Sequence, residues 1–237
     1  MEFDSARFDA LRAALVKVDT PTVCNALEVL APERRGYGYT VASLVCVRPE
    51  LPPMVGVART ASIRASRPSE LKGADARKLQ DDYYGYIDSG PKPSIVVIAD
   101  MDGPLRGYGS WWGEVNSNVH KGLGCIGLVT DGSVRDVPDL APGFQVLADR
   151  LTPSHAFVHP IEFGRPVTVA GMTVASGDLI HADRHGAVVI PWAVADRIAE
   201  TAALLARREK VIIAAAREPG FDHARLRNAW GDAAEIH

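Results

Sequence analysis

The sequence predicts a mixed α/β domain whose second half is rich in β-strands. Apolar residues recur at helical spacing near both ends of the chain, and short strand-like segments lie between them, separated by Gly and Pro. The chain has 237 residues, the length of one domain, and no repeat or long linker divides it. We therefore expect a single domain over residues 1–237, with N-terminal helices in 1–32 and a C-terminal helical extension in 191–237.

Two helices are expected at the N-terminus. Ser5 is a suitable N-cap for the first of them. The apolar face of this helix has helical spacing and consists of Phe8, Leu11, Leu15 and Val18. Thr20 and Pro21 are expected to cap and begin a second helix, with Pro at the favoured first position. This helix runs through Leu30, because Pro32 cannot continue it.

Strand-like and helical segments alternate in the middle of the chain. The segments with the composition of strands are 41–47, 55–63, 95–99, 125–130 and 144–148. A helical pattern covers 74–87, and the Gly- and Pro-rich segment 89–93 ends it. Residues 150–154 are expected to form a loop.

The second half predicts antiparallel strands followed by helices. Residues 167–174 are expected to form a hairpin with Gly171 at its turn or at a bulge. Residues 176–191 predict two more strands, separated by the turn 183–186. Pro191 is expected to begin a long helix through Arg217, and a short amphipathic helix closes the chain.

Composition excludes several classes of partner. The sequence is 47% hydrophobic and 23% charged, and its 26 basic and 29 acidic residues give a net charge of −3, so we expect no nucleic-acid partner. The longest apolar runs are too short to span a bilayer, so we expect no membrane partner. The three cysteines, Cys24, Cys46 and Cys125, are far apart and predict buried reduced thiols. With an acidic N-terminus unlike a signal peptide, the chain predicts a soluble, cytoplasmic protein.

The best candidates for catalytic and ligand-binding residues lie in the stretch 107–140. Gly113 and Glu114 open a helical segment, a strand follows at 125–130, and Arg135 and Asp136 come just after a glycine turn. A loop–helix–strand–loop unit returns the chain to the sheet edge it left, where open sheets commonly bind ligands. We therefore expect Glu114, Arg135 and Asp136 to share one pocket.

Two interpretations of this pocket stay open on the residues alone. Adjacent Arg and Asp residues are common as surface pairs of little energetic value. In this context, however, helix N–H groups and a guanidinium can bind a carboxylate or phosphate, and Glu114 and Asp136 together can hold a hard divalent cation. The alternatives are thus a surface ion pair and a metal-assisted anion site.

The other reactive residue types give weaker signals. The best-spaced histidines favour satisfied or solvent-facing side chains over metal ligands, and they are His155, His159, His181 and His185. Trp111 and Trp112 suit a pocket wall, a subunit contact or core packing equally well, and Lys121 is best interpreted as solvated. Asp100 and Asp102, at the end of a strand, are either supporting acids or solvated loop residues. The sequence lacks the phosphate-binding and nucleophile-elbow motifs.

The spacing of the acidic residue and the Arg-Asp pair is characteristic. Twenty residues separate Glu114 from Arg135, and Asp136 follows directly. This pattern resembles the signature of the RraA-like family, which includes the class II 4-hydroxy-4-methyl-2-oxoglutarate/4-carboxy-4-hydroxy-2-oxoadipate aldolases. Three further segments resemble the family: TPTVCNALEVL, MVGVARTASI and SGDLIHADRHGAVVIP. The resemblance covers most of the chain.

The resemblance implies a swivelling β/β/α-type domain that assembles as a homotrimer or hexamer, with active sites between subunits. It implies that Asp136 holds a Mg²⁺ or Mn²⁺ ion directly, that Glu114 holds it through water, and that Arg135 contacts a 2-keto acid. The backbone at the start of the helix would receive the substrate carboxylate, at Gly113, Val115 and Asn116.

The implied activity is that of a metal-dependent carbon–carbon lyase. Aldol cleavage of a 2-keto diacid and decarboxylation of oxaloacetate both yield a pyruvate enolate, whose charge a cation and Arg135 stabilise. Proton transfer needs a metal-bound water or an acid, and the family implicates a glutamate from the neighbouring subunit's C-terminal helix. Glu209 is the candidate here, with Glu200 as its rival.

Departures from the family pattern qualify this expectation. Glu114 replaces an aspartate of the characterised aldolases, Asn25 stands where aspartate is common, and His185 replaces a usual aspartate. The last two suggest a different substrate, and His185 is a candidate contact for a distal carboxylate. The alternative function is a non-catalytic regulator of ribonuclease activity. Such members lack the aspartate matching Asp136, so its retention favours an enzyme.

Overall fold

The computed structural model describes residues 3–237. Its helices are α1 (Ser5–Leu15), α2 (Thr20–Leu30), α3 (Gly73–Asp88), α4 (Glu114–Gly122), α5 (Ile198–Ala216) and α6 (His223–Ala234). Its strands are β1 (Val45–Cys46), β2 (Met54–Arg64), β3 (Ser94–Asp100), β4 (Cys125–Thr130), β5 (Ser133–Val134), β6 (Gln145–Ala148), β7 (Arg150–Leu151), β8 (His159–Phe163), β9 (Val167–Val169), β10 (Met172–Val174), β11 (Leu179–Asp183) and β12 (Gly186–Ile190).

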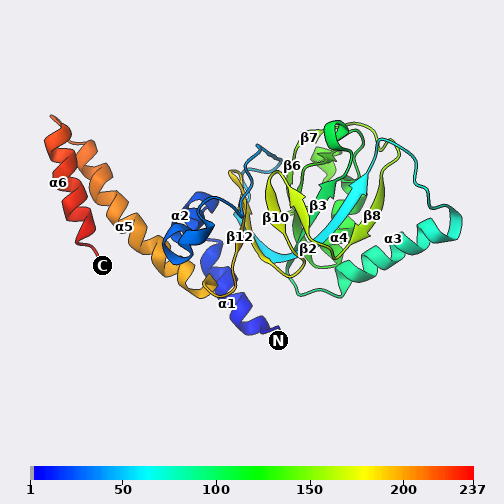
Figure 1. Ribbon diagram of the computed structural model, residues 1–237, viewed down its shortest axis with the longest axis horizontal. Coiled ribbons are helices and arrows are strands. Elements are labelled where there is room, and N and C mark those ends of the chain that lie inside the picture. Colours follow the sequence, from blue (N-terminus) through cyan, green and yellow to red (C-terminus); the bar gives the residue numbers. More distant parts are fainter. Residues whose placement is uncertain (1–2) are drawn as a thin grey trace.

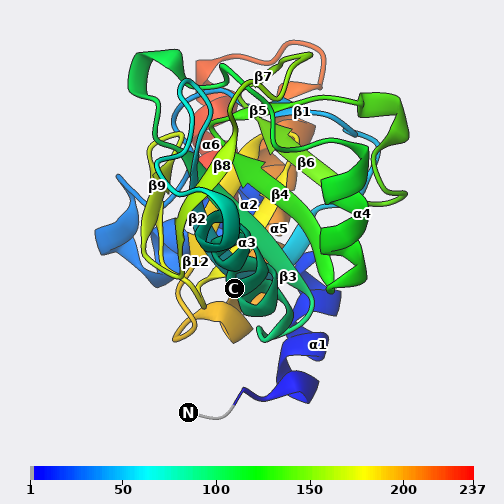
Figure 2. The same ribbon diagram turned by 90° about the vertical axis from the view of Figure 1, so that its right-hand side faces the viewer.

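One curved sheet organises the molecule. Its strand order is β1-β6-β4-β3-β2-β11-β12, and β8 pairs with the end of β2. The neighbours β2, β3, β4 and β6 are parallel, whereas β1, β8, β11 and β12 pair antiparallel. The sheet curls into a nearly closed barrel (Figure 2). The predicted swivelling α/β fold is confirmed.

The core has three parts, one for each group of elements that covers the sheet. The β9–β10 hairpin covers one face around Met172 and Val97. Tyr83 and Ile87 of α3 pack on the other face with Trp112. Helices α1, α2 and α5 bury the third part against β11 and β12. Strand β3 is buried along its whole length, as expected of a central parallel strand.

The two ends of the molecule differ in their helices (Figure 1). Helices α1 and α2 lie beside β12. Helix α5 continues away from the sheet, and α6 folds back against α5. Helix α3 extends from the opposite end. Within residues 3–237, none of the helices combines the length and apolarity needed to cross a membrane.

The helix starts correct two of the sequence expectations. Asp4, not Ser5, caps α1 by accepting the N–H of Arg7, and Asp19, not Thr20, caps α2 by accepting that of Thr22. In both cases a carboxylate one residue earlier provides the better acceptor beside the positive helix end. Helix α5 begins at Ile198 rather than Pro191, after a 3-10 turn at Ala195–Arg197.

The strand expectations were right in the centre and wrong at the edges. Strand β4 has the predicted bounds, and Gly171 forms the β9–β10 turn with φ 88°. Only Val45–Cys46 of the expected strand 41–47 is a strand, because Val41 donates instead to Ala170 in a loop. The expected loop 150–154 contains the short strand β7, and β8 was not predicted.

The three cysteines are free thiols, as predicted, but only one of them is buried. All three thiols are free; Cys125 is buried, whereas Cys24 and Cys46 are half-buried. Burial raises the pKa of both Cys24 and Cys125 to about 11, so these thiols stay protonated at neutral pH.

Candidate active site

The start of α4 and the loop after β4 meet, as the chain path predicts. Helix α4 connects the parallel strands β3 and β4, so its N-terminus lies at the carboxyl ends of these strands. Trp112 forms a parallel bridge with Val134, and the N–H of Arg135 donates to the carbonyl of Trp112 at 2.8 Å. These contacts bring the backbone N–H of Glu114 to 3.5 Å from Oδ2 of Asp136.

Gly113 lets the Asp136 carboxylate reach the helix start. A Cβ atom at Gly113 would lie 2.5 Å from Oδ2 of Asp136, closer than real Cβ contacts allow. Asp136 itself has left-handed backbone angles, φ 50° and ψ 40°, which are uncommon outside glycine. Its carboxylate also lies 3.4 Å from Nε of Arg135. The local backbone thus holds a carboxylate and a guanidinium side by side at a helix N-terminus.

The N-terminus of α4 has unused hydrogen-bond donors. Gly113 occupies the N-cap position and supplies no side chain to cap the helix. The N–H groups of the first helical turn, among them those of Val115 and Asn116, have no partner within the helix. Val115 is exposed, so an anion can approach these donors from solvent.

A cavity of about 410 Å³ opens beside this arrangement. The residues that line it are Gln80, Tyr84, Trp111, Gly113, Val115, Asn116, Arg135, Asp136, His155 and Val158. Asn116 is fixed within this wall, because it accepts the Tyr84 hydroxyl at 2.7 Å and donates to the carbonyl of Trp111 at 2.6 Å. Arg135 and Asp136 are each about one-third exposed.

The two neighbouring tryptophans have different places. Trp111 lines the cavity, whereas Trp112 is buried in the core, where it stacks on Phe144 and contacts His120. Two of the three expectations for this pair, a pocket wall and core packing, are therefore met, each by one residue, and the subunit contact stays a prediction.

Not every predicted site residue reaches the cavity. The side chain of Glu114 is exposed and lies outside the set that lines the cavity, although its backbone contacts Asp136. Glu200 and Glu209 belong to α5, which extends from the end of the molecule opposite α3 (Figure 1). Neither contributes to the cavity of its own chain.

The cavity itself offers one carboxylate to a hard divalent cation, that of Asp136. In the described chain, residues 3–237, there is no group of three or more His, Cys, Asp or Glu side chains placed to hold an ion. Glu114 begins the same helix, but its side chain is exposed outside the cavity. Mg²⁺ is commonly held by one or two carboxylates, with water and substrate completing its shell, so the chemistry of Asp136 is compatible with such an ion.

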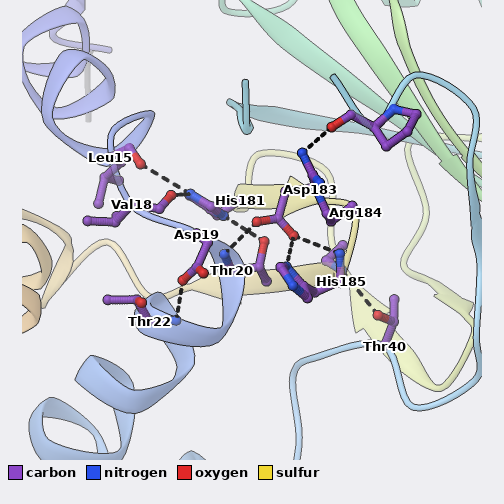
Figure 3. A network of polar contacts seen from close by, with 12 residues as sticks. Leu15, Val18, Asp19, Thr20, Thr22, Thr40, His181, Asp183, Arg184 and His185 are labelled. Carbon is purple, nitrogen blue, oxygen red and sulfur yellow. Dashed lines mark hydrogen bonds and ion pairs between the residues drawn. The ribbon is translucent and has the colours of Figure 1, made fainter. Parts of the chain in front are cut away.

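A second polar cluster, outside the cavity, joins the start of α2 to β11 (Figure 3). His181 is fully buried, and its Nε2 faces the carbonyls of Leu15 and Val18 at 3.2 and 3.1 Å. Nε2 must therefore carry the proton, and Nδ1 accepts the Thr20 hydroxyl at 3.0 Å. Burial lowers the pKa of His181, which keeps the ring neutral.

Asp183 completes this cluster and holds His185. Its carboxylate accepts the N–H of Thr20 at 2.9 Å, the N–H of His185 at 2.8 Å and Nδ1 of His185 at 3.0 Å (Figure 3). Burial raises the pKa of Asp183, but the donated hydrogen bonds outweigh it and lower the pKa below its usual value. His185 is engaged here and lies outside the cavity, as does Asn25.

Asp100, Asp102 and Lys121, the other candidates, all lie outside the cavity. Asp100 accepts the N–H groups of Asp102 and Gly107, and Asp102 accepts those of Ala65 and Ser66, so neither is a solvated loop acid. Lys121 is exposed, as expected, and reaches a backbone carbonyl.

The fold and the site together define a mixed α/β domain in which a helix start lies beside an Arg-Asp pair. The model of the RraA-like family, described as Aldolase/RraA, matches residues 20–189, and the chain therefore belongs to this family.

Individual relatives are more distant. Protein DlpA of Legionella pneumophila is 29% identical over 165 residues, which cover 67% of this chain and only 25% of DlpA. The chain thus spans about a quarter of that relative. An uncharacterized protein from Pseudomonas syringae pv. tomato superposes with a TM-score of 0.71 at 22% identity, covering 94% of both chains. Streptomyces coelicolor RraAS2, described as an unusual member of the RNase ES inhibitor RraA family, superposes with a TM-score of 0.67 at 23% identity, covering 89% of this chain and 96% of its own. The two structural similarities support the fold of this chain and do not establish its activity.

Proposed function

We propose that the protein is a divalent-metal-dependent lyase that cleaves a carbon–carbon bond of a 2-keto acid through a pyruvate enolate. The substrate would be a 4-hydroxy-4-methyl-2-oxoglutarate-type diacid, oxaloacetate or both. The observation that carries this proposal is the convergence of the α4 N-terminus with Arg135 and Asp136 on one cavity. The family includes both lyases and ribonuclease inhibitors, so membership alone leaves the choice open.

The residues of this site suit the steps of the reaction. The open N–H groups of Val115 and Asn116 would bind the carboxylate of the keto acid, and Arg135 would donate to its keto oxygen. This grip orients the substrate so that the breaking bond donates its electron pair into the keto group, which gives the enolate of pyruvate. Arg135 stabilises the negative charge that develops on the oxygen.

A Mg²⁺ or Mn²⁺ ion would be held by Asp136 directly and by Glu114 through water. When bound, the ion supplies positive charge at the keto oxygen. Asp136 suits this role because its carboxylate is partly exposed to the cavity, while the helix start holds its position.

In decarboxylation the departing fragment is CO₂; in aldol cleavage the 4-hydroxyl gives its proton to a carboxylate as its carbon becomes the keto group of the departing fragment. The enolate carbon must then receive a proton, which the same carboxyl group can return. Glu209 is proposed as the donor, with Glu200 as its rival, acting from a neighbouring subunit because α5 lies away from the cavity of its own chain. Proteins of this family are typically oligomeric, and a homotrimer or hexamer would provide such a neighbour. We propose that the protein acts on small-molecule substrates in the cytoplasm, without nucleic-acid or membrane partners.

A coupled assay of pyruvate release tests the proposal. Purified protein is offered oxaloacetate and a panel of 4-hydroxy-2-keto diacids, with Mg²⁺ or Mn²⁺ and with an excess of chelator. We expect pyruvate release that requires the metal and that Asp136→Ala abolishes, because this variant removes the direct ligand. Metal-independent turnover, or full activity in Asp136→Ala, would show that the mechanism is wrong.

The alternative function is non-catalytic regulation of a ribonuclease. Its support is the fold similarity to RraAS2, which is described as belonging to a family of RNase inhibitors. Inhibition of a purified ribonuclease, together with no turnover of any keto acid, would favour this alternative.

A further inference from the structure

His155 is a titratable residue of the cavity wall to which the proposed reaction gives no role. His155 lies in the loop between β7 and β8 and lines the same cavity as Arg135 and Asp136. Its side chain comes from a segment remote in sequence from both the helix start and the loop after β4. With α3, which supplies Gln80 and Tyr84, the wall of the cavity therefore comes from four parts of the chain.

The backbone of His155 is held rigidly. The carbonyl of His155 accepts the N–H of Val158 at 3.0 Å, which closes a tight turn. Ala156, inside this turn, has left-handed backbone angles with φ 47°, an uncommon state for alanine. The turn also packs closely on the loop before α4, because a Cβ at Gly109 would lie 2.2 Å from the His155 carbonyl oxygen.

In contrast, the ring of His155 is free. Within residues 3–237, neither ring nitrogen of His155 makes a hydrogen bond or an ion pair, and the residue is exposed to the cavity. The other histidines of the α/β body all have ring partners: His120, His159, His181 and His185. Strained backbone geometry concentrates at functional sites, and here it lies beside a cavity-lining histidine whose ring has no partner within residues 3–237.

The rest of the cavity wall shows which substrate group lacks a donor. Arg135 and the α4 N–H groups are assigned to the keto-acid end of the substrate. The Tyr84 hydroxyl and the Asn116 amide are already engaged with each other and with the backbone, and Val158 is apolar. The side-chain donors that remain on the wall are those of Gln80, Trp111 and His155, and of these the backbone of His155 is fixed by the tight turn. A second substrate carboxylate that enters this cavity loses bound water. Binding it costs free energy unless a side chain of the wall donates a hydrogen bond in place of that water.

We propose that His155 determines substrate specificity by donating a hydrogen bond to the second carboxylate of a 4-hydroxy-2-keto diacid. This is the carboxylate of the fragment that departs when the pyruvate enolate forms. The inference rests on the proposed function and names the residue that would recognise the second carboxylate of its diacid substrate.

The test compares two substrates that differ only in this carboxylate. The ratio of kcat/KM for a 4-hydroxy-2-keto diacid to that for the matching monoacid is measured with Mg²⁺, in wild type and in His155→Ala. A hydrogen bond to a charged group is worth about 1.5–3 kcal/mol, so wild type should prefer the diacid by at least about tenfold. We expect His155→Ala to lose most of this preference through a higher KM for the diacid.

A matched control separates this effect from a general disturbance of the loop. His159→Ala makes the same change four residues along the chain, at a ring that is bonded to the Phe157 carbonyl, and should keep the wild-type ratio. Where His155→Ala does not fold, His155→Leu serves instead, with thermal unfolding as the check.

The outcomes distinguish the two proposals. Turnover with an unchanged diacid-to-monoacid ratio in the His155 variant overturns the role of His155 alone. An equal loss for both substrates does the same, since it indicates a structural effect. Absence of turnover with every keto acid overturns the proposed function, and the specificity role with it.

Discussion

The cavity beside α4 and the cluster between α2 and β11 contain similar residue types but differ in burial and in hydrogen bonding. Each contains an aspartate, a histidine and the start of a helix. In the cluster, His181 and Asp183 are buried and their partners come from within the chain (Figure 3). In the cavity, Asp136 is partly exposed, His155 has no ring partner within residues 3–237, and the N–H groups of Val115 and Asn116 have no partner within α4.

This difference teaches how to tell structural from functional polar residues in this molecule. A buried polar group stabilises the fold only when its partners are all present, so a satisfied cluster has little capacity left for a ligand. Polar groups held by a rigid backbone but left without partners retain that capacity. Substitutions in the cavity should therefore change activity more than stability, and substitutions in the cluster should do the reverse.

Among substitutions that leave the proposed metal ligands in place, the largest expected effect is that of Gly113→Ala on activity. The added Cβ would meet Oδ2 of Asp136 at 2.5 Å, so the carboxylate must move away from the helix start. A misplacement of about 1 Å in a catalytic group costs on the order of 100-fold in rate, and we expect a loss of this size in pyruvate release. Thermal unfolding should change little, since Gly113 is extended at φ −165° and only a side-chain tip must shift.

Gly122→Ala is the matched control for this variant. It adds the same methyl group at the other end of α4, where no atom lies within 4 Å of the added Cβ. Its activity should equal that of wild type. Wild-type activity in Gly113→Ala as well would break the link between the carboxylate position and function.

A smaller effect, on stability, is expected from Thr20→Val in the cluster. The hydroxyl of Thr20 is the donor to Nδ1 of His181, and its removal leaves a buried acceptor without a partner. We expect a loss of about 1–3 kcal/mol in the free energy of unfolding, measured by denaturant titration, with activity retained. Thr22→Val is the control, because Thr22 is half-buried and contributes only its backbone N–H to the cap. Equal stability of the two variants would contradict the structural role of the cluster.

The sequence predicted the central part of the fold and of the site well. Strand β4 and the start of α4 lie where expected, because an apolar run and a glycine before an acidic residue are local signals. The meeting of Glu114 with Asp136 followed from the path of the chain between two parallel strands. The roles of these residues in binding and catalysis stay predictions.

The features that sequence reasoning missed depend on contacts between distant segments. Strand β8 contains Pro160 and lacks alternation, and it becomes a strand only because β2 offers it an edge. His155 is indistinguishable from the other histidines in the sequence. Its place in the cavity depends on a turn that packs against Gly109, 46 residues earlier, and no local pattern reports that contact.

The most direct test of the proposed chemistry is the exchange of the methyl protons of pyruvate with solvent, followed by ¹H NMR in D₂O. Formation of the enolate is the step that Arg135, Asp136 and the helix start are proposed to promote, and this assay needs no knowledge of the physiological substrate. Wild type with Mg²⁺ should exchange these protons, whereas chelator or Asp136→Asn, which keeps a residue tolerant of left-handed angles, should stop the exchange. Exchange at the wild-type rate in Asp136→Asn would contradict the assignment of this site.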